Sequence, residues 1–143
     1  MQTNFELKDE IYLAFDGLEL DLHNIFSFTG LEYSIEHCTL KLNWHLGPID
    51  PESKKWIKDT LPKKITVEFE GVSAFEFRPR DPEIPFSEDD CLQQAGYWSG
   101  EEWCTDVLAS NEEPDPDWKT AFGFRSGALI ALQAERATAR THA

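Results

Sequence analysis

The plainest alternation of apolar and polar residues runs through Thr39-Leu40-Lys41-Leu42-Asn43-Trp44-His45. Successive side chains of a strand point to opposite faces of a sheet, so this period of two predicts a half-buried β-strand. Strand-like segments precede it at residues 25–28 and 31–35. We therefore predict a β-hairpin in which Glu36-His37-Cys38 connects 31–35 to 39–45.

A second hairpin is predicted from residues 65–70 and 74–78. The first segment alternates cleanly, and the second resumes the pattern before Pro79 ends it. Gly71 lies between them and permits a bend or a bulge.

A third hairpin is predicted near the C-terminus. Residues 120–124 and 128–134 flank Arg125-Ser126-Gly127, whose glycine can adopt the positive φ of a hairpin turn. The alanine-rich segment 128–139 also suits a helix, because Ala, Leu, Gln, Glu and Arg are good helix formers. Between these alternatives we favour the strand.

Short helices are predicted at two places. Asp50-Pro51-Glu52 puts a capping residue before a proline at the first helical position, and Leu61-Pro62 ends the run. Ser87-Glu88-Asp89-Asp90 resembles a capping box, and Gly96 would end the helix that follows it.

These elements define the predicted fold class as α+β. We expect a β-rich single domain over residues 1–143, mostly an antiparallel sheet of about seven strands built from hairpins, with two short helices. Residues 110–117 are predicted to form an exposed acidic loop, because their composition cannot bury enough apolar surface to offset ordering. Aromatic side chains at strand spacing are predicted to fill the core: Phe26, Phe28, Trp44, Phe69, Phe75, Phe77, Phe122 and Phe124.

The charge of the chain is strongly negative and unevenly distributed. The chain has 13 basic and 27 acidic residues, which give a formal net charge of −14. The segment from Asp81 to Asp117 contains twelve acidic residues and no Lys or Arg. Binding to nucleic acid is disfavoured, because phosphate backbones need clustered basic residues. An anionic surface instead steers a basic protein partner, although the simpler interpretation is that the acidity only keeps the chain soluble.

Tryptophans lie among the acids of this segment. Aromatic anchors between carboxylates would form a protein-binding patch. Alternatively, the tryptophans cap the end of the sheet and the carboxylates only form a solvated face. The predicted partner-binding residues are Glu88, Asp89, Asp90, Trp98, Glu101, Glu102 and Trp103.

The chain lacks the common sequence motifs of enzymes. It contains no G-x-G-x-x-G, no G-x-x-x-x-G-K-[ST] and no G-x-S-x-G. Its histidines and cysteines lack the short paired spacings of zinc sites, and its acidic clusters lack the calcium-loop pattern. We therefore predict no catalytic residue, no metal and no cofactor.

Two catalytic alternatives stay open. Cys91 could meet His23 or His45 in space, although the carboxylates at residues 88–90 disfavour the reactive thiolate. Adjacent carboxylates beside tryptophan, as at Glu101-Glu102, could serve a small hydrolase or a carbohydrate-binding module.

The sequence also bears on where the protein resides. No segment approaches the roughly 18 consecutive apolar residues of a membrane span. Met1-Gln2-Thr3-Asn4 lacks the basic start and apolar run of a secretory signal. We therefore expect a cytoplasmic protein without membrane contact, whose three cysteines are reduced.

Three segments of the chain follow one another in an order that resembles the immunity protein 50 family of small bacterial proteins. They are Asp21-Leu22-His23-Asn24, the alternating segment 40–44 and the segment 65–72. The resemblance covers residues 20–78 and assigns no role to His23. It implies a non-catalytic cytosolic protein that neutralises a cognate toxin of a polymorphic toxin system by binding it.

The expected function is therefore binding without catalysis, by an immunity protein whose acidic surface meets a basic toxin. A small hydrolase or carbohydrate-binding module with an acidic, tryptophan-lined cleft is the first alternative. The second is a structural or assembly subunit that forms a homodimer through an exposed strand edge.

Overall fold

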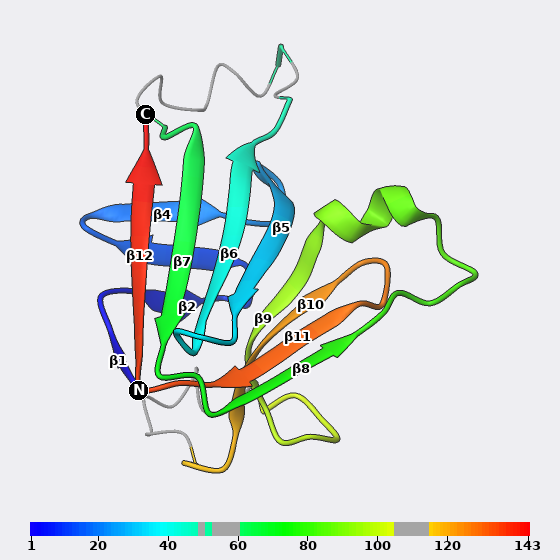
Figure 1. The fold of residues 1–143 in the computed structure, drawn as a ribbon. Helices are drawn as coiled ribbons and strands as arrows, with labels where there is room; N and C mark the ends of the chain where they lie inside the picture. The colour runs from blue at the N-terminus through cyan, green and yellow to red at the C-terminus, as the bar shows by residue number, and fades with distance from the viewer. Residues whose placement is uncertain (49–50, 53–60, 105–114) are drawn as a thin grey trace.

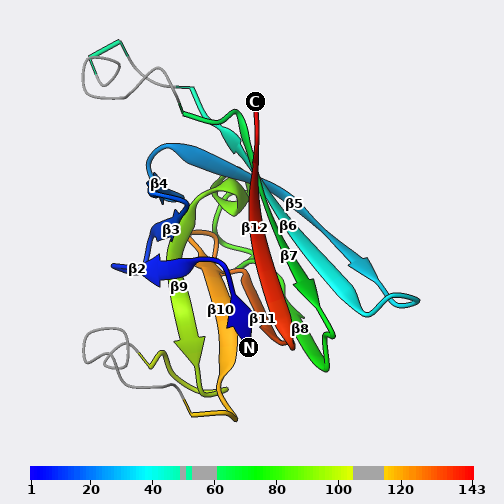
Figure 2. The same cartoon turned by 90° about the vertical axis from the view of Figure 1, so that its left-hand side faces the viewer.

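The structure is a computed structural model that describes residues 1–48, 51–52, 61–104 and 115–143. Within these residues, twelve strands form three sheets (Figure 1 and Figure 2). The five-stranded sheet has the order β1-β12-β7-β6-β5, the four-stranded sheet β8-β11-β10-β9, and the three-stranded sheet β2-β3-β4. The strands are β1 (Gln2–Thr3), β2 (Glu6–Lys8), β3 (Tyr12–Phe15), β4 (Leu18–Asp21), β5 (Phe26–Ser34), β6 (Thr39–Leu46), β7 (Lys64–Glu70), β8 (Ala74–Arg78), β9 (Leu92–Trp98), β10 (Lys119–Phe124), β11 (Leu129–Gln133) and β12 (Arg136–His142).

A long antiparallel ribbon joins the two larger sheets. One side of the ribbon is β7 followed by β8, and the other is β11 followed by β12; β7 pairs with β12, and β8 pairs with β11. The ribbon bends where the Glu135 N–H donates to the Glu70 carbonyl at 3.0 Å. Gly71 has φ 65°, and a Cβ there would lie 2.8 Å from the Glu135 side chain. The bend therefore requires glycine at this position.

The predicted hairpin between residues 65–70 and 74–78 is wrong. Both strands form as the alternation indicated, but β7 and β8 belong to different sheets and do not pair. Between them, Val72 is buried, and its N–H donates to the Cys38 carbonyl at 2.9 Å. This contact holds the connection against the β5–β6 turn, so the chain continues into the next sheet.

The other two predicted hairpins are confirmed. β5 pairs with β6 from Phe26↔Leu46 to Ser34↔Thr39, and β10 pairs with β11 across the turn that contains Gly127. The alanine-rich segment forms β11 and β12, so its strand interpretation is also correct. Pairing with β10 and β7 decides the outcome, because these partners satisfy the backbone groups that a helix would have satisfied internally.

The helical part of the predicted α+β class is wrong, whereas its β-rich character is confirmed. The described residues contain no helix longer than a single 3₁₀ turn, η2 (Phe86–Asp90). The segment expected to continue from it as a helix is strand β9, because it pairs with β10 and buries Leu92 and Ala95.

The other predicted helix falls mostly outside the described residues. Of the predicted loop 110–117, only residues 115–117 are described, and they are exposed.

The three-stranded sheet was not anticipated from the sequence. Its β3–β4 hairpin turns at Asp16 and Gly17, whose φ values are 52° and 76°. Two successive positive φ values match the turn that best follows strand twist, and Asp-Gly is a favoured dipeptide for it. The Ala95 N–H of β9 donates to the Glu10 carbonyl at 2.6 Å, so the β2–β3 turn is attached to the four-stranded sheet.

The first and last strands lie side by side in the five-stranded sheet. β1 pairs in parallel with β12, with Gln2 opposite Arg136. Asn4 extends this contact through its side chain, which accepts from the Ala139 N–H at 2.7 Å and donates to the Ala139 carbonyl at 3.0 Å. The Asn4 side-chain amide thus bonds to the Ala139 backbone as the backbone of a further β1 residue would.

One apolar core joins all three sheets. Its largest fully buried side chains include Trp44 of β6, Phe69 of β7 and Phe122 of β10. The Trp44 ring lies 5.9 Å from Phe122 and 5.2 Å from Phe28 between centroids. Most of the predicted core aromatics are buried or half-buried, but Phe77 is 52% exposed, so its assignment to the core was wrong.

Candidate functional site

An apolar groove of about 530 Å³ separates the edge of the five-stranded sheet from the edge of the four-stranded sheet. Two of its aromatic side chains are largely exposed: Phe77 of β8 at 52% and Phe86 of η2 at 75%. We call this feature the β5–β8 groove. Its lining residues are Phe28, Thr29, Gly30, Leu31, Phe77, Pro79, Arg80, Phe86, Ser87, Asp89, Asp90, Phe124, Ala128 and Ile130.

The chain after β8 shapes one wall of the groove. The Asp81 N–H donates to the Ser126 carbonyl at 2.8 Å, which ties this segment to the β10–β11 turn. The Asp81 side chain then accepts from the Glu83 N–H at 2.9 Å, and the Ile84 N–H donates to the Asp81 carbonyl at 3.0 Å. These bonds form a compact turn that ends at Pro85. The η2 turn begins directly after it and places Phe86 in solvent.

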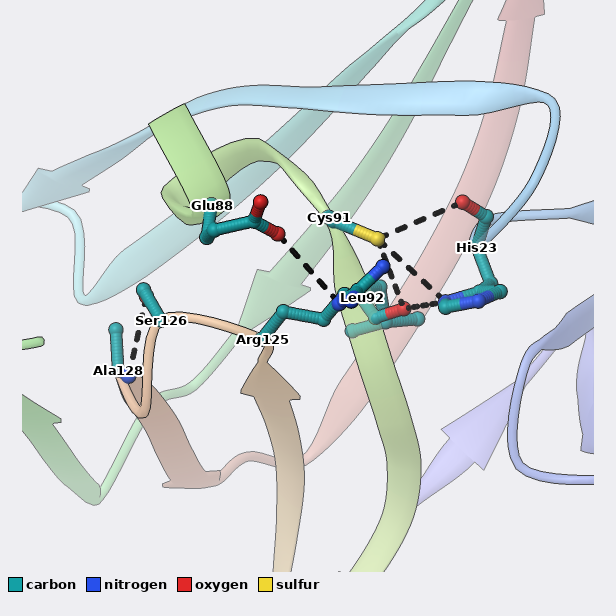
Figure 3. Close-up of polar contacts among 7 residues, drawn as sticks. All are labelled: His23, Glu88, Cys91, Leu92, Arg125, Ser126 and Ala128. Atoms are coloured by element: carbon teal, nitrogen blue, oxygen red, sulfur yellow. Dashed lines mark hydrogen bonds and ion pairs between the residues drawn. The ribbon is translucent and has the colours of Figure 1, made fainter. Parts of the chain in front are cut away.

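Acidic and basic side chains border the groove. Arg80 donates to Asp89 Oδ2 through Nε at 2.9 Å and through a terminal nitrogen at 2.6 Å. Arg125 lies 3.5 Å from Glu88 (Figure 3). Arg80 directly precedes the segment 81–117 and Arg125 follows β10, so residues from outside the segment partly neutralise its charge. Asp90 is exposed and forms no ion pair within the described residues.

The arginine contact changes the titration of Asp89. Hydrogen bonding from the Arg80 guanidinium lowers the pKa of the carboxyl below its ordinary value. A lowered folded-state pKa stabilises the fold above the ordinary carboxyl pKa, and this stabilisation is lost as pH falls through the lowered value. The Asp89 side chain is 38% exposed, so solvent screening keeps the effect small.

We expect Arg80→Gln to raise the pKa of Asp89 toward its ordinary value, because the charged donor is lost. A carboxyl-carbon NMR titration measures this shift. Glu76 is the internal control, since Arg78 lowers the pKa of Glu76 and the substitution leaves that contact in place. An unchanged pKa of Asp89 would show that the ion pair does not form in solution.

The structure separates the predicted partner-binding residues into two groups at opposite ends of β9. Glu88, Asp89 and Asp90 belong to η2, just before the strand. Glu101 and Glu102 follow its other end and are exposed. The strand has seven residues and so spans roughly 20 Å. Of these five acidic residues, Asp89 and Asp90 line the β5–β8 groove.

Trp98 and Trp103 lie together on the other face of the four-stranded sheet. They form an isolated β-bridge, and Trp103 covers Gly123, where a Cβ would lie 2.9 Å from the indole ring. Trp98 is only 4% exposed, and the Arg78 guanidinium lies 4.5 Å from its ring centroid. A hollow of about 350 Å³ lies beside them. Because Arg78 covers the Trp98 ring, that ring offers no open platform for a sugar.

Cys91 and His23 lie in contact, as the alternative of a Cys–His nucleophile pair requires. The Cys91 sulfur lies 3.5 Å from His23 Nδ1 (Figure 3). The same nitrogen lies 2.5 Å from the Leu92 carbonyl, which can only accept a hydrogen bond, so Nδ1 carries the proton. It therefore cannot act as a base for the thiol.

The electrostatics of Cys91 agree with this geometry. Burial raises the pKa of the Cys91 thiol, against the smaller opposing effect of the Arg125 guanidinium. Asp90 and Glu88 raise it further. The carboxylates thus act in the expected direction, although burial is the larger cause. The thiol stays protonated near neutral pH, and the pair resembles a structural contact more than a nucleophile.

Among the described residues, no group of three or more His, Cys, Asp or Glu side chains is arranged to hold a metal ion. None of the helices in the described part of the chain is long and apolar enough to cross a membrane.

Sequence reasoning missed the exposed aromatics of the groove. Phe77 continues the alternation of its strand, so the sequence pattern predicts a core position. Its exposure arises because β8 is an edge strand of its sheet, which the pattern does not show. Phe86 carried a usable signal, because it is a large apolar residue between Pro85 and the polar run Ser87-Glu88-Asp89-Asp90. An apolar residue isolated in such a segment has little chance of reaching a core.

Comparison of the chain with known protein families, with curated proteins and with solved structures finds no match.

Proposed function

We propose that the chain is a non-catalytic binding protein that recognises a basic protein partner through the β5–β8 groove. The observation that carries this proposal is the exposure of Phe77 and Phe86 beside an apolar groove bordered by acidic side chains. Exposed aromatic residues that flank a hollow are typical anchors of protein interfaces.

Charge supports a basic partner. The formal net charge of −14 gives a long-range attraction for cations. At the groove itself, Asp90 has no ion pair in the described residues, so a basic side chain can approach it without displacing an arginine. The field raises the association rate, and the aromatic contacts give the affinity.

A toxin neutralised by an immunity protein is the specific partner that we propose within this class. The resemblance of residues 20–78 to the immunity protein 50 family supports it, together with the acidic character of the chain. Inhibition by binding needs no catalytic group in the inhibitor, which fits a Cys91–His23 pair without a base.

The test is selection of short peptides from a displayed random library on the wild-type protein. We expect the enriched peptides to combine basic and apolar residues. Phe77→Ser and Phe86→Ser are each expected to weaken binding of a synthetic enriched peptide by about tenfold, because interface anchors contribute above 1 kcal/mol. Fluorescence anisotropy measures the dissociation constant at low and high salt, and affinity should fall as salt rises.

Ile35→Ser is the matched control. Ile35 is an 81% exposed apolar residue outside the groove, so its replacement changes surface hydrophobicity without touching the site. Its affinity should equal that of the wild type. Failure to enrich any peptide, or equal binding by all three variants, would contradict the proposed function.

A further inference from the structure

The groove has an open sheet edge as one of its walls. Among the described residues, β5 is the last strand of the five-stranded sheet, and its only neighbour there is β6. Figure 2 shows β5 at the margin of the sheet, with β6 and β7 beside it. An edge strand presents unpaired backbone N–H and C=O groups that can bond to another strand.

The register identifies which backbone groups point outward. The Leu46 N–H of β6 donates to the Lys63 carbonyl, on the side of β7, whereas the Gly47 N–H donates to the Ile25 carbonyl, on the side of β5. Because the bonding direction alternates along a strand, Leu40 and Leu42 also face β7. Their partners in β5 are Tyr33 and Leu31. The backbone groups of Leu31 and Tyr33 therefore point to the open edge.

The two faces beside this edge differ in chemistry. On the inner face lies the β5–β8 groove, with Leu31 in its lining and Phe77 exposed across it. On the outer face, Glu32 is exposed and has no ion pair among the described residues. A strand added to β5 would point alternate side chains into the groove and toward Glu32.

We propose that the partner contributes an extended segment that pairs with the edge of β5 and alternates apolar with basic residues. Its apolar side chains fill the groove on the inner face, and its basic side chains lie opposite Glu32 on the outer face. The inference rests on the proposed function and adds the conformation and the residue pattern of the segment that is bound. Backbone bonds to Leu31 and Tyr33 supply affinity, and the alternating side chains supply specificity.

Charge decides between this occupant and a second copy of the chain. Two copies would bring together two net charges of −14, which oppose association. The net negative charge of the chain attracts a basic segment and repels a second copy.

The experiment uses a synthetic enriched peptide whose backbone amides are N-methylated one at a time. Methylation removes a donor, so alternate positions should each lose about tenfold in affinity and the intervening positions should change little. In parallel, amide exchange followed by NMR should slow at Leu31 and Tyr33 when the peptide binds. The Glu32 amide is the control, because its register partner Lys41 faces β5 and its bond exists without peptide.

The outcomes separate the two proposals. A peptide that binds with Phe86 dependence, but shows neither alternation on methylation nor slowed exchange at Leu31 and Tyr33, would overturn strand addition and leave the groove function standing. Absence of any enriched peptide would overturn the proposed function itself. Slowed exchange at the same two amides without peptide, together with dimers in sedimentation, would show that a second copy occupies the edge, and would also overturn the inference.

Discussion

Trp44→Ala is expected to lower the free energy of unfolding by about 3–5 kcal/mol. Trp44 is fully buried and packs against Phe28 and Phe122, so truncation leaves a large cavity where the two main sheets meet. Domains of this size are stable by roughly 5–15 kcal/mol, so the variant should lose a large part of its stability. Urea denaturation followed by circular dichroism measures the change.

Two companion variants show whether packing is the cause. The Trp44 indole N–H is buried and has no hydrogen-bond partner among the described residues, so Trp44→Phe removes no polar contact and should cost less than Trp44→Ala. Phe86→Ala truncates an aromatic ring that is 75% exposed, and its stability should stay within about 0.5 kcal/mol of the wild type. Equal losses for Trp44→Ala and Phe86→Ala would contradict the assigned core.

Strand positions were more predictable than strand partners. Residues 39–45 alternate because one face of β6 is buried, and that pattern is local in the sequence. The partner of β8 is β11, more than fifty residues away in the chain, and no local pattern specifies it. The expectation that β7 and β8 pair followed from their proximity in sequence, which the bend at Gly71 overrides.

The wrong helix at residues 87–96 has a similar cause. A turn, η2, does form at these residues, but it begins at Phe86 with Pro85 as its N-cap and no side-chain capping hydrogen bond, so Ser87 does not cap it as predicted. The next residues leave it because the edge of β10 offers a partner for their backbone, with Ala95 opposite Phe122. Tertiary pairing outweighs helix propensities of a few tenths of a kcal/mol per residue.

The β3–β4 hairpin could have been predicted from the sequence. Asp16-Gly17 lies between Tyr12-Leu13-Ala14-Phe15 and Leu18-Glu19-Leu20-Asp21, and this dipeptide between apolar runs is a strong hairpin signal. The structure places a β-hairpin with a two-residue turn there. In contrast, nothing in the sequence indicates that this hairpin packs on the same core as the larger sheets.

The candidate site was predictable only in part. The acids at residues 88–90 were singled out from composition, and two of them, Asp89 and Asp90, line the β5–β8 groove. Their arginine partners, Arg80 and Arg125, lie outside the acidic segment, and only the fold brings Arg125 to Glu88. The groove itself depends on two sheet edges that approach each other, so its existence could not be read from any single segment.

The three-stranded sheet raises the question of whether the chain folds as one cooperative unit, as the expectation of a single domain requires. Its strands have three or four residues each, and so short a sheet is marginal by itself. Two leucines of this sheet, Leu13 and Leu20, are nevertheless at most 1% exposed. They belong to the same core cluster as Trp44 and Phe122. We therefore expect this sheet to unfold together with the other two.

Leu13→Ala is expected to lower the free energy of unfolding by about 2–5 kcal/mol in a single transition, because the cavity opens inside the common core. Urea denaturation monitored by both tryptophan fluorescence and circular dichroism measures the loss and shows whether the two probes coincide. Leu18→Ala, in the same sheet but 36% exposed, is the matched control and should change stability by less than about 0.5 kcal/mol. A separate early transition in Leu13→Ala, with the tryptophan signal unchanged, would mean that the small sheet opens independently and that the chain comprises two folding units.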